Sequence, residues 1–152
     1  MLSARYALWA VAAGALIPVM AVLNARLGRA LQEPFHAPVI LFSVGLVALV
    51  IVSLVFTGGL PDVLKLKSAQ PIDLMGGLIV AFYVLSVTIL APRFGVGNVI
   101  LFAMVAQIVC SALIDHFGLL GAMVREISLV RLVGLALLLA GLFITQLSIA
   151  KS

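Results

Sequence analysis

The chain has 152 residues, of which 65% are hydrophobic and only 9% are charged. Soluble domains carry about 25% charged residues, so this composition excludes a water-soluble globular domain. The nine Lys and Arg residues give a net charge of +4, but they are scattered at the ends of apolar segments, which argues against nucleic acid as a partner. The composition therefore predicts a protein whose main partner is the lipid bilayer.

Five apolar segments are long enough to cross the hydrocarbon core of a bilayer, which takes about 20 residues of helix. They lie at residues 7–24, 37–57, 73–91, 96–115 and 131–150. The connections between them are too short to form a domain with its own core. The sequence thus predicts an all-α protein, a single integral membrane domain over residues 1–152, in which five transmembrane helices form a bundle.

The first segment carries small residues and a proline on one narrow face, at which the helix can bend. At 100° per residue the residues of this face fall within a narrow arc: Gly14, Pro18, Ala21, Gly28 and, at the edge, Asn24. Pro18 removes a backbone hydrogen bond, and the carbonyl that it frees needs a partner from another helix or from water in a cavity. We expect this face to point inward, as a packing face or as part of a substrate pathway. Asn24 could alternatively cap the end of the helix.

The second segment is expected to be a lipid-facing scaffold, whereas the third places Tyr83 in the middle of a span. A phenol in hydrocarbon must find a hydrogen-bond partner or water, because an unsatisfied hydroxyl there costs several kcal/mol. Tyr83 is therefore expected either to line a cavity or to bond to a carbonyl of a neighbouring helix. Pro92 and Arg93 are expected to end this helix and to anchor it at the membrane surface.

The fourth segment carries the strongest polar pattern. Gln107, Ser111 and Asp115 recur every four residues and form one stripe on a helix, which Asn98 begins. Gln107, near the middle, is the best candidate for an interior role because its amide can both donate and accept. Asp115 is a candidate coupling acid, although its place near the interface also fits a surface role.

No segment carries a pattern typical of catalysis or of a bound cofactor. Asp115 and His116 are adjacent, so on a helix their side chains point about 100° apart and do not form a catalytic dyad. The only cysteine, Cys110, cannot form an internal disulfide and is expected to be buried as a small apolar residue. We expect no enzyme activity, no cofactor and no metal.

In the fifth segment small residues share one face. Gly134, Gly141 and Thr145 lie on it, and small residues allow the backbones of membrane helices to approach closely. The face is expected to be either a dimer contact or an internal packing face.

The positive charges are divided almost evenly between the two sides that five spans define. The amino-terminal side would carry Arg5, Lys65, Lys67, Arg125 and Arg131, and the opposite side Arg26, Arg29, Arg93 and Lys151. Orientation normally follows an excess of Lys and Arg in cytoplasmic loops, so a difference of one leaves insertion undecided. The charges allow either two opposite orientations or a single one with the amino terminus inside.

Three separated motifs follow one another along the chain. They are Gly14-x3-Pro18-x5-Asn24-Ala25-x-Leu27-Gly28, Gly76-Gly77-x5-Tyr83-x7-Ala91-Pro92-Arg93-x-Gly95 and Gln107-x3-Ser111-x3-Asp115-His116-Phe117-Gly118-x2-Gly121. Together they resemble the five-helix YdcZ-like branch of the drug/metabolite transporter superfamily over essentially the whole chain. Met20 and Ala106 depart from the family's pattern, which often has Gln and Gly there.

The resemblance implies a half-size transporter of a bacterial-type inner membrane. Such chains pair with a second copy in the opposite orientation, which creates the inverted repeats from which alternating access arises. The expected function is a secondary transporter or facilitator of a small organic metabolite, built as an antiparallel homodimer. Its expected pathway residues are Pro18, Asn24, Tyr83, Asn98, Gln107 and Ser111.

Two alternatives remain at this point. One is a dual-topology ion channel, and the other is a half-transporter subunit that needs an oppositely oriented partner chain. The first helix lacks the carboxylate with which small multidrug relatives couple protons to export. That leaves Asp115 as the acid in the resembling stretch that could couple an ion.

Overall fold

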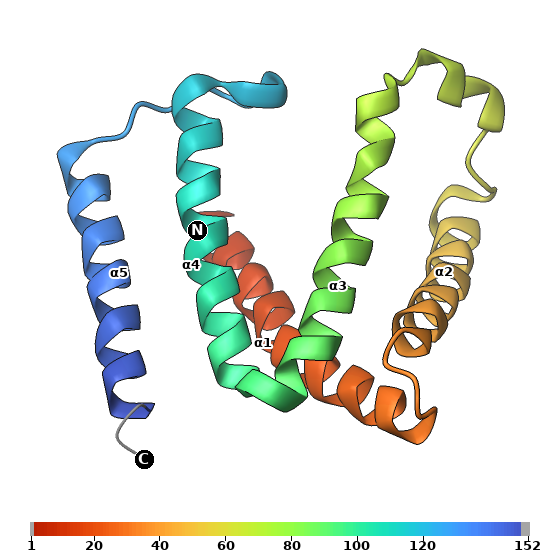
Figure 1. Ribbon diagram of the computed structural model, residues 1–152. Coiled ribbons are helices and arrows are strands. Elements are labelled where there is room, and N and C mark those ends of the chain that lie inside the picture. The colour runs from red at the N-terminus through yellow and green to blue at the C-terminus, as the bar shows by residue number, and fades with distance from the viewer. Residues whose placement is uncertain (1, 150–152) are drawn as a thin grey trace. The chain divides into compact units, whose positions relative to one another are not determined.

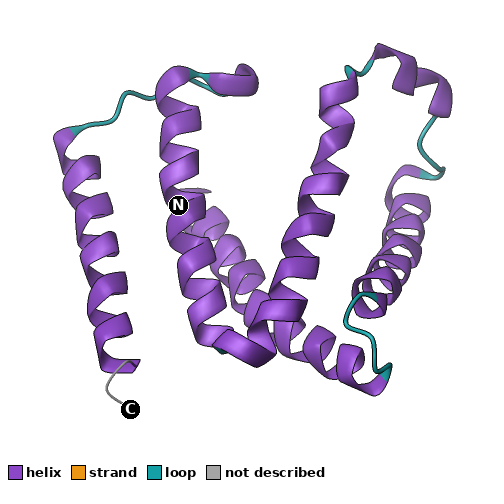
Figure 2. Ribbon diagram, viewed as in Figure 1, coloured by secondary structure: helices purple, strands orange, loops and turns teal. Residues whose placement is uncertain are grey.

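The computed structural model describes residues 2–149, and these form helices and connections without a strand (Figures 1 and 2). The long helices are α1 (Leu2–Ala30), α2 (His36–Thr57), α3 (Met75–Phe94), α4 (Val96–Phe117) and α5 (Leu129–Ile149). All five are long and apolar enough to cross a membrane, which confirms the predicted transmembrane helices. Ala150, the last residue of the predicted fifth span, and Lys151, counted among the charges, lie outside the described residues.

Short 3-10 helices lie in the two longer connections: η1 (Val63–Ser68) and η2 (Pro71–Leu74) between α2 and α3, and η3 (Leu119–Gly121) between α4 and α5. Internal contacts divide the chain into two compact units, Met1–Val96 and Gly97–Ser152. In the first unit, α1 packs against both α2 and α3, and α2 also contacts α3.

Helix α1 is longer than the predicted span of residues 7–24, because it continues to Ala30. Asn24 therefore lies inside the helix and does not cap it, and the helix also runs without interruption through Pro18. The extension is a turn with Arg26 and Arg29, which hydropathy assigns to the connection; it contains no proline, and the helix continues through its one glycine, Gly28.

A left-handed cap ends α1 and turns the chain directly into α2. The Glu33 N–H donates to the Gly28 carbonyl and the Gln32 N–H donates to the Arg29 carbonyl, both at 3.1 Å. Gln32 adopts a φ of 58°, a conformation that glycine usually supplies at this position. A Cβ atom at Gly28 would lie 3.1 Å from the Cα of Pro34, so the close return of the chain depends on this glycine.

Small side chains form the core of the first unit. The buried apolar residues of its helices are Ala21, Ala25, Ala37, Pro38, Val84, Val87 and Ala91. Such residues allow helices in a membrane to approach closely where water cannot drive them together. The inward orientation predicted for the narrow face of α1 is confirmed for Ala21, Asn24 and Gly28, while Gly14 lies in open space.

In the second unit, the connection after α4 folds back onto the end of that helix. Gly118 follows the helix with a φ of 61°, and the Arg125 N–H donates to the Asp115 carbonyl at 2.8 Å. The Ile127 N–H donates to Nδ1 of His116 at 3.2 Å. These bonds hold the end of α4 beside the start of α5, where the charged residues of this unit gather.

Candidate functional site

The best-buried polar contact of the first unit joins α1 to α3. The Asn24 side-chain amide donates to the Thr88 hydroxyl, which in turn donates to the Val84 carbonyl at 2.7 Å. Only 3% of Asn24 and 2% of Thr88 is exposed, so water cannot replace the bond between them. Asn24, predicted as a pathway residue, is thus tied to a residue of α3 that the sequence did not single out.

The signal for Thr88 was weak, because a threonine in an apolar span usually bonds to its own helix. Thr88 does so, as do Ser86, whose hydroxyl donates to the Phe82 carbonyl, and Ser111, whose hydroxyl donates to the Ile108 carbonyl. What distinguishes Thr88 is that its oxygen also accepts from Asn24. A buried asparagine needs a partner on another helix, but its identity depends on the register of the two helices.

Two pockets flank this contact within the first unit. One, of about 340 Å³, is lined by the end of α1, the following turn and the end of α3, and includes Thr88, Arg29 and Arg93. The other, of about 480 Å³, lies between α1 and α2 and is apolar except for Asn24. The buried Asn24–Thr88 pair therefore contributes one residue to each pocket.

Polar bonds join α4 to α5 near both ends. Arg131 of α5 forms an ion pair with Asp115 of α4 at 2.9 Å, and the Gln146 side-chain amide donates to Oδ1 of the Asn98 side chain at 3.2 Å. The two pairs run in opposite chain directions, so α4 and α5 form an antiparallel hairpin. Asn98, a predicted pathway residue, and Asp115, the candidate coupling acid, both have partners that the sequence did not identify.

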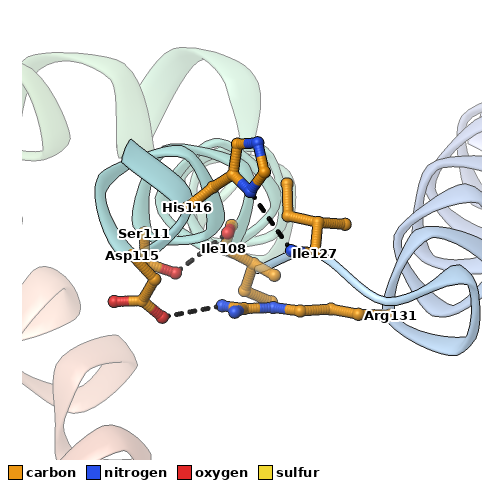
Figure 3. Close-up of polar contacts among 6 residues, drawn as sticks. All are labelled: Ile108, Ser111, Asp115, His116, Ile127 and Arg131. Carbon is orange, nitrogen blue, oxygen red and sulfur yellow. Dashed lines mark hydrogen bonds and ion pairs between the residues drawn. The ribbon is translucent and has the colours of Figure 1, made fainter. Parts of the chain in front are cut away.

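Asp115 and His116 point away from each other, as expected for neighbours on a helix (Figure 3). The Asp115 carboxylate accepts from Arg131, whereas Nδ1 of His116 accepts from the backbone of Ile127. Both side chains of the ion pair are about one-third exposed, at 33% for Arg131 and 34% for Asp115. The pair therefore lies at the edge of the helix hairpin, and no dyad is formed.

Tyr83 and Gln107, the mid-span candidates, make no side-chain hydrogen bond within the described part of the chain. Tyr83 is half-buried in the first unit, and Gln107 is exposed on α4 in the second. In hydrocarbon such groups cannot stay without partners, because each lost bond costs several kcal/mol. One of the two expectations for Tyr83, a hydrogen bond to a carbonyl of a neighbouring helix, is not found among residues 2–149.

Two further predictions concern faces of single helices. The small-residue face of α5 is exposed, and a Cβ atom at Gly134 or Gly141 would meet nothing within 4 Å. Thr145 is exposed too, and its hydroxyl donates to the Leu142 carbonyl of its own helix at 2.7 Å. The described part of the chain does not use this face for packing.

The expectation for Cys110 was wrong, because its side chain is exposed. Residue 110 lies on a face of α4 that the described chain leaves uncovered, and hydropathy alone cannot tell a lipid-facing position from an interior one. Residues 2–149 contain no group of three or more His, Cys, Asp or Glu side chains arranged to hold a metal ion.

Comparison with protein families adds a finding over nearly the whole chain. Residues 5–144 match the family described as "Putative inner membrane exporter, YdcZ". No curated protein and no solved structure matches the chain. Five apolar helices fit a small protein of the drug/metabolite transporter type, and a membrane exporter is a transporter rather than an enzyme. The chain therefore belongs to the YdcZ family of inner membrane exporters and is an integral membrane protein with a role in transport.

Proposed function

We propose that two copies of this chain, inserted in opposite orientations, form a secondary transporter or facilitator that exports a small organic metabolite by alternating access. The observation that carries the proposal is that the side chains of Tyr83 and Gln107 make no hydrogen bond among residues 2–149. Polar groups in the middle of transmembrane helices mark pathways or contacts with partners. A second copy would supply both a partner and a water-filled site near the midplane.

The distribution of charge supports opposite orientations. Five Lys and Arg residues lie on one side of the five spans and four on the other, so neither insertion is favoured. Two oppositely inserted copies are related by an axis in the membrane plane, and the inverted repeats of many transporters have this symmetry. The exposed small-residue face of α5, with Gly134 and Gly141, is the proposed contact between copies.

The proposed pathway combines free and bonded residues. Tyr83 and Gln107 make no side-chain hydrogen bond among residues 2–149, and Ser111 bonds only to the Ile108 carbonyl of its own helix, so these three are the proposed substrate contacts. Pro18 weakens α1 at the point where we propose that it bends. Asn24 and Asn98 are bonded to other helices, so in this proposal they hold the helices that form the pathway.

Asp115 is the proposed coupling acid. Its ion pair with Arg131 gives the coupling a mechanism, because protonation of the carboxylate would remove its charge and release the guanidinium. The start of α5, where Arg131 lies, would then be free to move away from the end of α4.

Transport by the parent and by a Tyr83→Phe/Gln107→Ala variant tests the pathway. Both proteins would be reconstituted in vesicles loaded with a mixture of cell metabolites, and the compounds lost from the vesicles identified by mass spectrometry. We expect the double variant to lose export of at least one compound that the parent exports. The matched control is Tyr6→Phe/Gln70→Ala, which makes the same changes at exposed positions outside the middle of the spans.

Equal export by the parent and the double variant would refute the proposed pathway. Currents far above carrier turnover in the same vesicles would favour an ion channel in its place.

Labelling of single cysteines tests the orientation. In a Cys110→Ser background, Ser68→Cys and Glu33→Cys place a thiol in the connections on opposite sides of the membrane. A membrane-impermeant maleimide applied to intact cells should label about half of each protein if both orientations occur equally. Complete labelling of one and none of the other would rule out the antiparallel homodimer and leave a need for a separate, oppositely inserted partner chain.

A further inference from the structure

The smaller pocket of the first unit is unusual in its charge. It has a volume of about 340 Å³ and is lined by two arginines, Arg29 from the end of α1 and Arg93 from the end of α3. No acidic residue lines it. Among the described residues the ion pair found is that of Arg131 with Asp115, so neither pocket arginine is neutralised by a carboxylate.

Apart from the arginines, the lining is mostly small or apolar, with Ala25, Gly28, Pro34, Ile89 and Pro92, and Gln32 adds an amide. Thr88 lines the pocket too, but its hydroxyl already donates to the Val84 carbonyl, so the two arginines and Gln32 are the donors left for a ligand. Ligand pockets usually measure about 300–1,000 Å³, so this one is at the lower end and fits a single small group.

The position of Gln32 is a separate indication. It occupies the left-handed position of the α1 cap, with a φ of 58°, where a side chain is disfavoured and glycine is the usual residue. Gln32 nonetheless lines the pocket together with both arginines. Residues in disfavoured backbone conformations gather at ligand sites, where the side chain serves a purpose that offsets the strain.

Helix-end arginines also serve as membrane anchors, but anchoring explains less of this arrangement. An anchor needs only to reach the headgroup region, and it does so independently of other anchors. Arg29 and Arg93 lie 64 residues apart in the sequence, on different helices, and line the same pocket. All three helix-end arginines Arg26, Arg29 and Arg93 are exposed, but Arg26 does not line the pocket.

We propose that Arg29 and Arg93 form a binding site for an oxyanion, a carboxylate or phosphate group, at the end of the first unit. The planar guanidinium matches the two oxygens of such a group and can donate two parallel hydrogen bonds to it. The group can belong to a soluble metabolite or to the headgroup of an anionic lipid, and the chemistry of recognition is the same. This site is distinct from the mid-span residues of the proposed pathway and can be tested without transport.

Binding would be measured on the purified full chain in nanodiscs, which expose both membrane faces, so that insertion preference has no effect. In phosphatidylcholine nanodiscs the probe is inorganic phosphate, titrated by calorimetry. In a second arm, native mass spectrometry counts phosphatidylglycerol molecules retained from mixed phosphatidylcholine and phosphatidylglycerol discs. The pocket variant is Arg29→Gln/Arg93→Gln, and the control Arg5→Gln/Arg26→Gln removes the same charge outside the pocket.

We expect the parent and the control to bind at least one probe and the pocket variant to bind it at least about tenfold more weakly, since two charge-assisted contacts are lost. Binding of phosphate identifies a soluble ligand, and selective retention of phosphatidylglycerol alone identifies a lipid headgroup. If neither probe binds, or if the pocket variant and the control bind equally, the proposal is wrong.

A second variant covers the case in which the glutamine pair does not insert. Arg29→Lys/Arg93→Lys keeps both positive charges, which influence membrane insertion, but loses the planar guanidinium groups that can donate two parallel hydrogen bonds. We expect binding to weaken by about tenfold relative to the parent. An unchanged affinity of this variant would overturn the proposed recognition.

Discussion

Replacing Thr88 with valine keeps the shape of the side chain but removes the hydroxyl that accepts from Asn24. Because only 3% of Asn24 is exposed, water cannot take over the lost bond. Leaving a buried polar group without a partner costs about 1–3 kcal/mol in proteins, while interhelical hydrogen bonds in membranes contribute about 0.6 kcal/mol on average and up to about 1.7. The depth of burial favours the upper part of the membrane range, so we expect Thr88→Val to lower the free energy of unfolding by about 1–2 kcal/mol.

A double-mutant cycle isolates this bond from other effects of the substitutions. Asn24→Leu, Thr88→Val and the double variant would be unfolded reversibly in mixed micelles by increasing the fraction of denaturing detergent. We expect a coupling energy of about 1 kcal/mol. Ser86→Ala is the matched control, because the Ser86 hydroxyl bonds to its own helix through the Phe82 carbonyl. A coupling between Asn24 and Thr88 below about 0.5 kcal/mol would be within ordinary additivity and would refute the reasoning.

Three further stability predictions use the same unfolding assay. Gly28→Leu should lower the free energy of unfolding by about 1–3 kcal/mol, because a Cβ at residue 28 would lie 3.1 Å from the backbone of the following turn. The control Gly14→Leu lies in open space and should not destabilise the protein. Equal effects of the two substitutions would contradict this prediction. Asp115→Asn should lower the free energy of unfolding by about 1 kcal/mol or less, since both side chains of the ion pair are one-third exposed. Adding Arg131→Gln should lower it little further. If the effects of the two substitutions add in full, the residues act separately. Gln32→Gly should stabilise by about 1 kcal/mol because it relieves the left-handed backbone, and destabilisation would show that the side chain contributes packing.

Which segments become helices depends on local properties of the chain, whereas where each helix ends does not follow from hydropathy. Apolar length is a property of each segment alone, and all five predicted spans became helices for that reason. The end of α1 was misplaced because hydropathy marks where the membrane surface lies, whereas a helix ends where backbone capping ends it. The left-handed cap at Gln32 supplies that ending at Ala30.

The candidate residues were predicted by type, but their contacts were not. An asparagine or aspartate in an apolar helix indicates an important position without indicating its partner. Thr88, Gln146 and Arg131 are those partners, and they lie 64, 48 and 16 residues away along the chain. A pairing over such distances depends on the rotation and register of two neighbouring helices.

The sequence by itself determined that this chain is a five-helix membrane protein of a transporter family, because hydrophobic length and ordered motifs are local properties. Only the tertiary structure decided which polar groups are paired with one another in the described part of the chain. It buried Asn24 against Thr88, joined Asp115 to Arg131, left Gln107 exposed, and placed two arginines around one pocket. The physical reason is that in hydrocarbon every polar group needs a partner, and only the packing of helices decides which one is within reach.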